Sequence, residues 1–344
     1  MIMLKRFCFT FSFLAGLGWT SGAGADYSEH PKAREFIERV AAKHSLDPAE
    51  IKNILAQAEK QQAILEAISR PAEKVLTWGE YRKIFLGQSR VDQGVEFWRQ
   101  HRDTLKKVSA EYGVAREIIV AIIGVETRYG RNKGSYRVID ALATLGFDYP
   151  ARSDFFSGEL EQFLLLASEQ QQNPADLVGS YAGAMGYGQF IPSSYRAYAV
   201  DYNGDKIADI WNNPDDAIAS VANYFMKHGW QAGQRIALRA RIKNEYDKAS
   251  LNDRKKPGLT ISELIKKGFV PVDENIAEAQ LAVPLMYEGE HGKEFWLGFD
   301  NFYVITRYNK SLLYAMAVFQ LSQEIKSQYV SQLDNDIPEQ NPAG

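Results

Sequence analysis

The spacing of apolar residues along the chain changes twice. Between residues 31 and 99 apolar side chains recur every three or four positions, as Ile51 and Leu55 do, which predicts amphipathic helices. Helical spacing continues through residues 103–232, where loops rich in glycine and aromatic residues interrupt it. From Ile236 the period falls to two, which indicates strands. We therefore expect a mainly α (α+β) protein with a small β region, followed by a last helix.

These changes also predict how the chain is divided into segments. The end of the chain is polar and contains two prolines, which is typical of a tail without fixed structure. The expected segments are a signal peptide at 1–25, an N-terminal helical domain at 26–102, a helical core at 103–232, a small β domain at 233–302, a helical segment at 303–331 and a disordered tail at 332–344.

The first 25 residues have the pattern of a secretory signal. Lys5 and Arg6 precede an apolar run that ends at Leu17, and small residues follow up to Ala25. We expect export to the periplasm and cleavage after Ala25 or Ala23. The alternative is an uncleaved membrane anchor, but the run is shorter than the roughly 20 apolar residues that a membrane span requires.

Charge and cysteine content exclude several functions. The signal segment holds two of the 40 basic residues and none of the 43 acidic ones, so the mature chain is acidic and nucleic acid is not an expected partner. The single cysteine, Cys8, lies in the signal segment, so we expect no disulfide and no thiolate chemistry. The five histidines form no His-Glu-x-x-His motif, and neither a catalytic zinc nor a serine triad is indicated.

Residues 117–130 predict a helix that carries an acidic residue on its apolar face. Glu126 continues a row of apolar residues spaced four apart, and Gly130 is suited to cap the helix. Burial and the negative end of the helix dipole both disfavour a carboxylate, so we expect a raised pKa for Glu126. A protonated acid near neutral pH suits cleavage of a glycosidic bond. The alternative to a catalytic role is an ion pair of Glu126 with Arg128 or Arg131. The alternative to the helix is a buried strand.

A second candidate site is the loop at residues 179–192, which contains four glycines and three aromatic residues. Glycine lets backbone approach a ligand closely, and aromatic rings suit a sugar chain. The loop lacks the third glycine and the Gly-Lys-Ser of nucleotide-binding motifs. Val178 stands where the hydrolase nucleophile motif around Ser180 needs glycine. A packed loop between helices is the alternative.

A third candidate is the acidic segment at residues 201–209, which spaces oxygen-bearing side chains as a calcium loop does. Lys206 replaces the glycine usual at position 6, and Asn212 stands at position 12 in place of glutamate. The alternative is a solvated acidic turn. The candidate ligands are Asp201, Asn203, Asp205 and Ile207, with Asp215 or Asp216 closing the site.

Several short motifs follow one another along nearly the whole mature chain. They are GVETRYG at 124–130, ALATL at 141–145, FFSGEL at 155–160, GAMGYGQFIPSSY at 183–195, VANYF at 221–225, HGW at 228–230 and RYNKS at 307–311. In this order they resemble the B-type lytic murein transglycosylases, glycoside hydrolase family 103.

The resemblance implies a lysozyme-like helical core, flanked by a helical domain and a small β domain, with a glycan in the groove between them. It makes Glu126 the catalytic residue. It also implies a structural calcium ion in the 201–209 loop, with Asp216 as the better closing ligand, and no required cofactor. The implied groove residues are Tyr81, Arg152, Ser180, Met185, Tyr187, Gln189, Phe190, Tyr224, Tyr308 and Asn309.

The chemistry that the resemblance implies uses one acid. Glu126 protonates the oxygen between N-acetylmuramic acid and N-acetylglucosamine while the muramyl acetamido group supports the developing cation. As a base, Glu126 then takes the proton of the C6 hydroxyl, and a 1,6-anhydro sugar forms. Most glycosidases use two carboxylates. Asp140, Asp148, Asp154 and Glu159 all have plain interpretations as surface or capping groups.

Two other functions compete with this one. A hydrolytic muramidase would use Glu126 with water as the acceptor. A non-catalytic scaffold would bind the wall glycan without an acid of raised pKa. Peptidoglycan is the partner in every case, cell-wall synthesis proteins are further candidates, and the sequence leaves the oligomeric state open.

Overall fold

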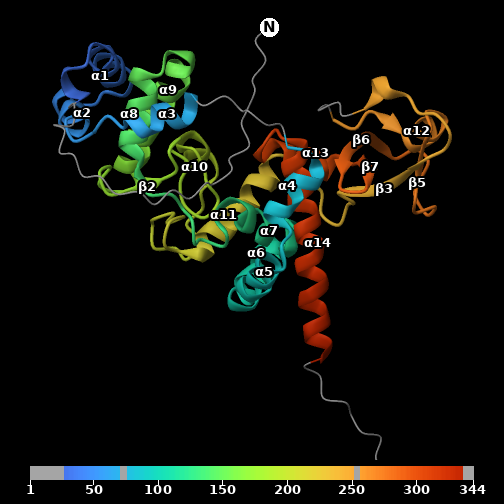
Figure 1. Ribbon diagram of the computed structural model, residues 1–344. Coiled ribbons are helices and arrows are strands. Elements are labelled where there is room, and N and C mark those ends of the chain that lie inside the picture. The colour runs from blue at the N-terminus through green and yellow to red at the C-terminus, as the bar shows by residue number, and fades with distance from the viewer. Residues whose placement is uncertain (1–26, 70–75, 252–255, 336–344) are drawn as a thin grey trace, which may run out of the picture. The chain divides into compact units, whose positions relative to one another are not determined.

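The computed structural model describes residues 27–69, 76–251 and 256–335, which fall into two compact units (Figure 1). Unit 1 comprises the described residues of 74–129 and 221–344, and unit 2 those of 9–73 and 130–220. Each unit is built from stretches far apart in the sequence. The units therefore cut across the expected linear domains, whose limits stay predictions.

Unit 2 is helical. Its core helix α8, Val138–Asp148, is buried on every side from Val138 to Phe147, which explains its almost continuous apolar sequence. Helices α3 and α9 pack against it. The other elements are η1 Tyr27–Glu29, α1 Pro31–His44, α2 Pro48–Leu55, α3 Gln62–Ser69, β1 Tyr136–Arg137, η2 Pro150–Arg152, α9 Ser153–Glu169, β2 Val178–Gly179, α10 Pro192–Tyr198 and the start of α11 Pro214–Lys227.

Two acidic residues that we expected at the surface or in caps are buried in unit 2. Asp140 is 3% exposed and accepts hydrogen bonds from the Arg137 side chain and the Glu59 backbone amide. Glu159 is 6% exposed and accepts from the amide and hydroxyl of Ser193. Asp140 holds the loop at Glu59 against α8, and Glu159 on α9 holds the first turn of α10. Of the two expected alternatives, a surface position is excluded for both by their burial, and Glu159 has the capping one.

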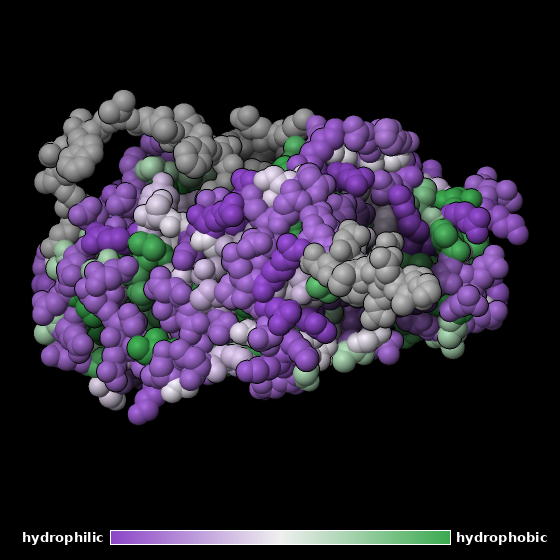
Figure 2. Space-filling model, turned by 90° about the horizontal axis from the view of Figure 1, so that it is seen from below, coloured by the Kyte–Doolittle hydropathy of each residue, from purple (hydrophilic) through white to green (hydrophobic). Residues whose placement is uncertain are grey.

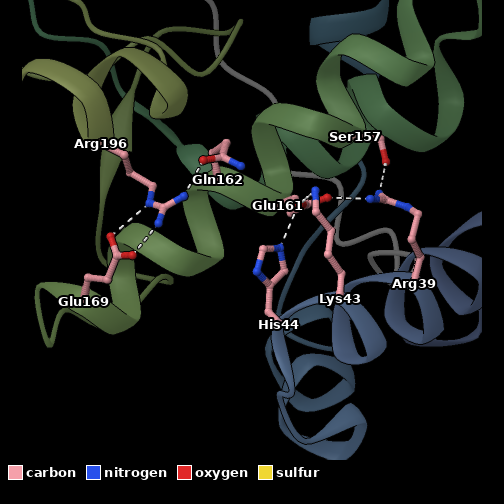
Figure 3. Close-up of polar contacts among 8 residues, drawn as sticks. All are labelled: Arg39, Lys43, His44, Ser157, Glu161, Gln162, Glu169 and Arg196. Carbon is pink, nitrogen blue, oxygen red and sulfur yellow. Dashed lines mark hydrogen bonds and ion pairs between the residues drawn. The ribbon is translucent and has the colours of Figure 1, made fainter.

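A buried carboxylate on α9 also fastens α1 (Figure 3). The Glu161 side chain is 3% exposed and accepts hydrogen bonds from Arg39, from Lys43 at 2.7 Å and from His44 at 2.8 Å. Burial by itself raises the pKa of Glu161, but the bonds from Lys43, His44 and Arg39 outweigh it and lower the pKa to about 2. Glu161 therefore remains ionised in the folded chain.

Unit 1 combines helices with a small sheet. Helix α14 packs along α7, α5 and α4 (Figure 1), so the last helix of the chain completes the packing around α7. The helices are α4 Trp78–Phe85, α5 Gln88–Gln100, α6 Arg102–Tyr112, α7 Arg116–Thr127, the end of α11, α12 Ile261–Lys266, α13 Asp300–Tyr308 and α14 Leu312–Asn335.

The sheet of unit 1 is antiparallel, with the strand order β4-β6-β7-β3-β5. Its centre is a hairpin whose strands pair from Val283↔Gly298 to Gly289↔Gly292. Phe269 and Leu297 belong to its buried core. The strands are β3 Ala237–Ile242, β4 Leu259–Thr260, β5 Phe269–Pro271, β6 Leu281–Gly289 and β7 Gly292–Gly298, with the short η3 Lys248–Ser250 between β3 and β4.

The predicted fold class is confirmed: the chain is mainly helical and carries a small sheet at the two stretches of alternating residues. Two helices extend beyond limits expected for the segments, which stay predictions. Helix α13 begins at Asp300, before the expected end of the β region at 302. Helix α14 continues to Asn335, past the expected start of the tail at 332. The signal segment and residues 336–344 lie outside the described residues.

The surface is mostly hydrophilic on the face that Figure 2 shows, where hydrophobic residues occur in small groups. Leu281 and Val272 of the β region are among the large apolar side chains that are more than one third exposed. No helix within the described ranges is both long enough and apolar enough to cross a membrane.

We predict that Glu161→Gln lowers the free energy of unfolding by about 2 kcal/mol at pH 7, because a charged acceptor is lost from three hydrogen bonds. The folded pKa of Glu161 is depressed, so its contribution is present above pH 4.5 and is lost as the pH falls toward 2. Urea unfolding of the wild type and the variant should therefore give a larger difference in the free energy of unfolding at pH 7 than at pH 3.

The matched control is Glu169→Gln. Glu169 pairs with Arg196 on the same unit but is 48% exposed, so its loss should cost less than about 1 kcal/mol (Figure 3). If both substitutions lowered the free energy of unfolding equally, or if the effect of Glu161→Gln did not change with pH, the stabilising role of ionised Glu161 would be contradicted.

Candidate active site

Helix α7 ends one residue after Glu126. Arg128 and Tyr129 both have a left-handed backbone, with φ of 52° and 60°. The amide of Arg128 bonds to the carbonyl of Gly124, which closes the helix. The predicted helix is confirmed, but the predicted cap at Gly130 was wrong: Arg128 is the cap residue.

The strained turn after α7 is held by a tyrosine that folds back onto the helix. A Cβ on Gly124 would lie 2.6 Å from the ring of Tyr129, and one on Gly94 of α5 would lie 2.6 Å from its hydroxyl. That hydroxyl donates to the Arg90 carbonyl at 2.8 Å, and the Arg90 guanidinium donates to the Gly124 carbonyl at 2.5 Å. Two glycines thus make room for the ring that fixes the end of α7.

The Glu126 side chain is half-buried and its carboxylate oxygen Oε1 accepts a hydrogen bond from the Tyr314 hydroxyl at 2.5 Å. Burial raises the pKa of Glu126 to about 7, although the bond from Tyr314 lowers it. Burial and this hydrogen bond are the two causes of the shift. Arg128 bonds instead to Gln93 and Ser89 of α5, which removes it as an ion-pair partner for Glu126.

Unit 1 gathers aromatic residues beside Glu126. The charge of Glu126 raises the pKa of both Tyr308 and Tyr314, after the larger effect of burial. Tyr81 is 3% exposed, and its charge, when ionised, also raises the pKa of Tyr314. The ring of Tyr224 lies 4.7 Å from that of Tyr308. Three predicted residues, Tyr81, Tyr224 and Tyr308, therefore lie in the unit that carries Glu126.

Asn309, the next predicted residue, lies between α13 and α14. Its side-chain oxygen accepts the amide of Ser311 at 3.1 Å, and the Ser311 hydroxyl accepts the amide of Tyr314 at 3.3 Å. Ser311 is thus an N-cap for α14. The RYNKS motif orders the first turn of the helix that carries Tyr314.

In unit 2 the loop at residues 179–192 is folded tightly on itself. The Ser180 hydroxyl accepts the amides of Ala182 and Ala184, so it closes a turn. Met185 is 0% exposed and Phe190 3% exposed, and their backbones pair with each other. Both side chains therefore pack inside the loop, and their implied place along a groove stays a prediction.

Tyr187 and Gln189 of this loop remain partly exposed. A Cβ on Gly130 would lie 2.1 Å from the Tyr187 ring, and the Lys133 ammonium stands 4.8 Å from the ring centre. The Gln189 amide donates to the carbonyls of Lys133 and Gly186. Gly130, expected as a helix cap, is therefore required by the ring of Tyr187 and by its own φ of 81°.

Arg152, also in unit 2, lies over two aromatic rings. Its guanidinium carbon is 4.3 Å from the ring centre of Phe155 and 4.9 Å from that of Phe156. Such contacts orient the side chain.

The acidic loop of unit 2 has the backbone of a cation-binding turn. Lys206 adopts a φ of 77°, which is the conformation that the glycine at this position usually supplies. Asp201 accepts the amides of Gly204 and Lys206. Asp216 is fully buried and accepts amides from the same loop. In the described chain no three His, Cys, Asp or Glu side chains are gathered closely enough to hold a metal by themselves.

Comparison with known proteins decides the family. A model of the transglycosylase SLT domain matches residues 28–323. The chain is 44% identical over 311 residues to membrane-bound lytic murein transglycosylase B of Escherichia coli (strain K12), which covers 88% of this chain and 84% of that protein. The chain belongs to the lytic murein transglycosylases. It is an enzyme that acts on peptidoglycan.

Solved structures of other lytic transglycosylases share the fold. Soluble SltB1 of Pseudomonas aeruginosa is 48% identical with a TM-score of 0.83, over 87% of this chain and 99% of that one. Escherichia coli Slt35 in complex with calcium is 45% identical with a TM-score of 0.81, over 89% and 96%. SltB3 of Pseudomonas aeruginosa in complex with NAG-anhNAM-pentapeptide is 31% identical with a TM-score of 0.79, over 88% and 80%.

Sequence reasoning about this transglycosylase missed Tyr314, the residue that directly contacts Glu126. The two residues are 188 positions apart, so no local spacing could join them. Ser311 was the available signal, since a serine before an apolar helical run predicts an N-cap and hence the helix start.

Proposed function

We propose that Glu126 is the single acid/base of this lytic transglycosylase. The observation that carries the proposal is the carboxyl held half-buried at the end of α7 with a pKa of about 7. At neutral pH a large fraction of such a group is protonated, so it can act first as an acid and then as a base. The family and the Gly-Val-Glu-Thr-Arg motif support the assignment.

The proposed reaction needs no water. Glu126 gives its proton to the glycosidic oxygen between N-acetylmuramic acid and N-acetylglucosamine as the bond from that oxygen to C1 breaks. The muramyl acetamido oxygen supports the positive charge at C1. The Glu126 carboxylate then takes the proton of the C6 hydroxyl while O6 bonds to C1. A nucleophile held within the same molecule has an effective molarity of roughly 10⁵ M or more, which favours ring closure over attack by water.

Glycan contacts are proposed for the partly exposed polar and aromatic residues. Tyr187 and Gln189 are ordered by neighbouring backbone, and Arg152 is supported by two rings. Pre-ordered side chains of this kind bind a sugar chain with little further loss of conformational entropy. SltB3, a relative, binds a NAG-anhNAM-pentapeptide. We infer that this chain takes the same class of substrate.

We further propose that the acidic loop binds a structural calcium ion through Asp201, Asn203, Asp205, Ile207 and Asp216. The left-handed Lys206 removes the main sequence objection, because the loop has the required backbone without glycine. Slt35, a relative that is 45% identical, has been solved in complex with calcium. The ion would hold the loop between α10 and α11 and would supply no chemistry to the reaction.

Export by the N-terminal segment and action in the periplasm are also proposed. The relative of Escherichia coli is membrane-bound, and peptidoglycan is the substrate of the family. A retained anchor is the alternative, and cell-wall synthesis proteins are the proposed protein partners.

We predict that Glu126→Gln lowers the rate of glycan cleavage roughly 10³-fold or more, because the amide keeps the shape but cannot transfer the proton. Wild-type protein digesting purified sacculi should release muropeptides that end in 1,6-anhydromuramic acid, as read by mass spectrometry. Circular dichroism and the melting temperature should show that the variant is folded.

Substantial turnover by the folded variant would remove Glu126 from its role. Mainly reducing ends, heavier by one water, would make the protein a hydrolytic muramidase. Binding of sacculi by the wild type without any release would leave only a scaffold.

The calcium proposal predicts a rise in melting temperature of about 5 °C when millimolar calcium replaces a chelator, since a ligand that binds only the folded state stabilises it. Asp205→Asn should abolish most of the rise, because it removes one ligand charge while its oxygen can still accept the Ile207 amide. Magnesium serves as the ion control. A wild-type melting temperature unaffected by calcium would indicate a solvated turn.

A further inference from the structure

The hydroxyl of Tyr314 makes the two oxygens of Glu126 inequivalent. Tyr314 is 3% exposed, and its hydroxyl donates to Oε1 of Glu126 at 2.5 Å. A buried hydroxyl keeps such a bond because losing it without replacement is costly. An oxygen that already accepts a strong bond is the poorer place for the acid proton, which leaves Oε2 to carry it.

The turn that carries Tyr314 is held from two sides. Ser311 caps the first turn of α14, where Tyr314 lies, and Asn309 in turn orients Ser311. The hydroxyl of Tyr287, on strand β6, donates to the Leu312 carbonyl of the same turn at 3.2 Å. The RYNKS motif and the sheet therefore act together on the residue that contacts Glu126.

Other polar groups near the end of α7 are engaged elsewhere. On α5, Arg90 donates to the Gly124 carbonyl, and Arg128 donates to Gln93 and Ser89 of that helix. Tyr308 at the end of α13 is stacked on Phe225 at 5.6 Å, and the charge of Glu126 raises the pKa of its hydroxyl.

The charge of Tyr81 on α4, when ionised, raises the pKa of Tyr314. Lys326 of α14 pairs with Glu117 at the opposite end of α7. Among the described residues of these helices, Tyr314 is the one that donates a hydrogen bond to Glu126.

We propose that Tyr314 is a positioning residue that keeps the transferable proton of Glu126 on Oε2 and stabilises the carboxylate that remains after the proton has left. The proposal rests on Glu126 being the acid/base. When Oε2 gives its proton to the glycosidic oxygen, the bond at Oε1 becomes a stronger, charge-assisted one. Oε2 is then free to take the proton of the C6 hydroxyl, so the same oxygen serves both steps.

The test is Tyr314→Phe, which removes only the hydroxyl. Activity requires protonated Glu126 and is lost as the pH rises through its pKa of about 7. The bond from Tyr314 lowers that pKa, so its loss should move the alkaline limb of the kcat/KM profile to higher pH by about one unit. We expect kcat to fall about tenfold with KM changed less than about twofold, because the bond strengthens after the substrate is bound.

The matched control is Tyr195→Phe, which removes a buried hydroxyl that donates to the Ala208 carbonyl in unit 2 and has no part in holding Tyr314. It should leave the alkaline limb in place. An unmoved limb in Tyr314→Phe, or one that moves to lower pH, would overturn the proposal.

The Glu126→Gln variant separates this failure from that of the proposed function. If Glu126→Gln kept its activity, the acid/base assignment would fall. If it were inactive and Tyr314→Phe still left the limb unmoved, only the role of Tyr314 would fall.

Discussion

Burial of one carboxyl group at the C-terminal end of α7 is the constraint on which the site depends. The helix is otherwise buried almost throughout, so Glu126 enters an apolar environment as a continuation of its face. Desolvation and the helix dipole both disfavour the charged form there. The fold tolerates the group because Tyr314 offers it one hydrogen bond, which moderates the pKa without returning it to its ordinary value.

Rigid support for that carboxyl comes from packing that glycine makes possible. Tyr129 lies in the space left by Gly94 and Gly124 and fixes a turn with two successive left-handed residues. In unit 2, Gly130 leaves room for the Tyr187 ring. Both glycines of the GVETRYG motif thus have steric roles, and such close packing keeps a functional side chain in one geometry.

Local pattern was sufficient to predict the helix that carries Glu126, its apolar face and the strands at Leu238 and Leu285, because each depends on residues close in sequence. It could not predict contacts made across the fold. The partner of Glu126 is 188 residues away, and the burial of Met185 depends on how its loop folds back. Lys206 shows the opposite error, since a residue that seemed unsuitable adopts the required backbone.

The central claim is that Glu126 is an acid with a pKa near 7 in the folded protein. Carbon-13 NMR of protein labelled at the glutamate side-chain carboxyl measures this directly, and the resonance is assigned by its absence from Glu126→Gln. The account predicts a titration midpoint near 7 for that resonance. A midpoint near the ordinary value of 4.5 would mean that the carboxyl is ionised at neutral pH, and it would contradict the account.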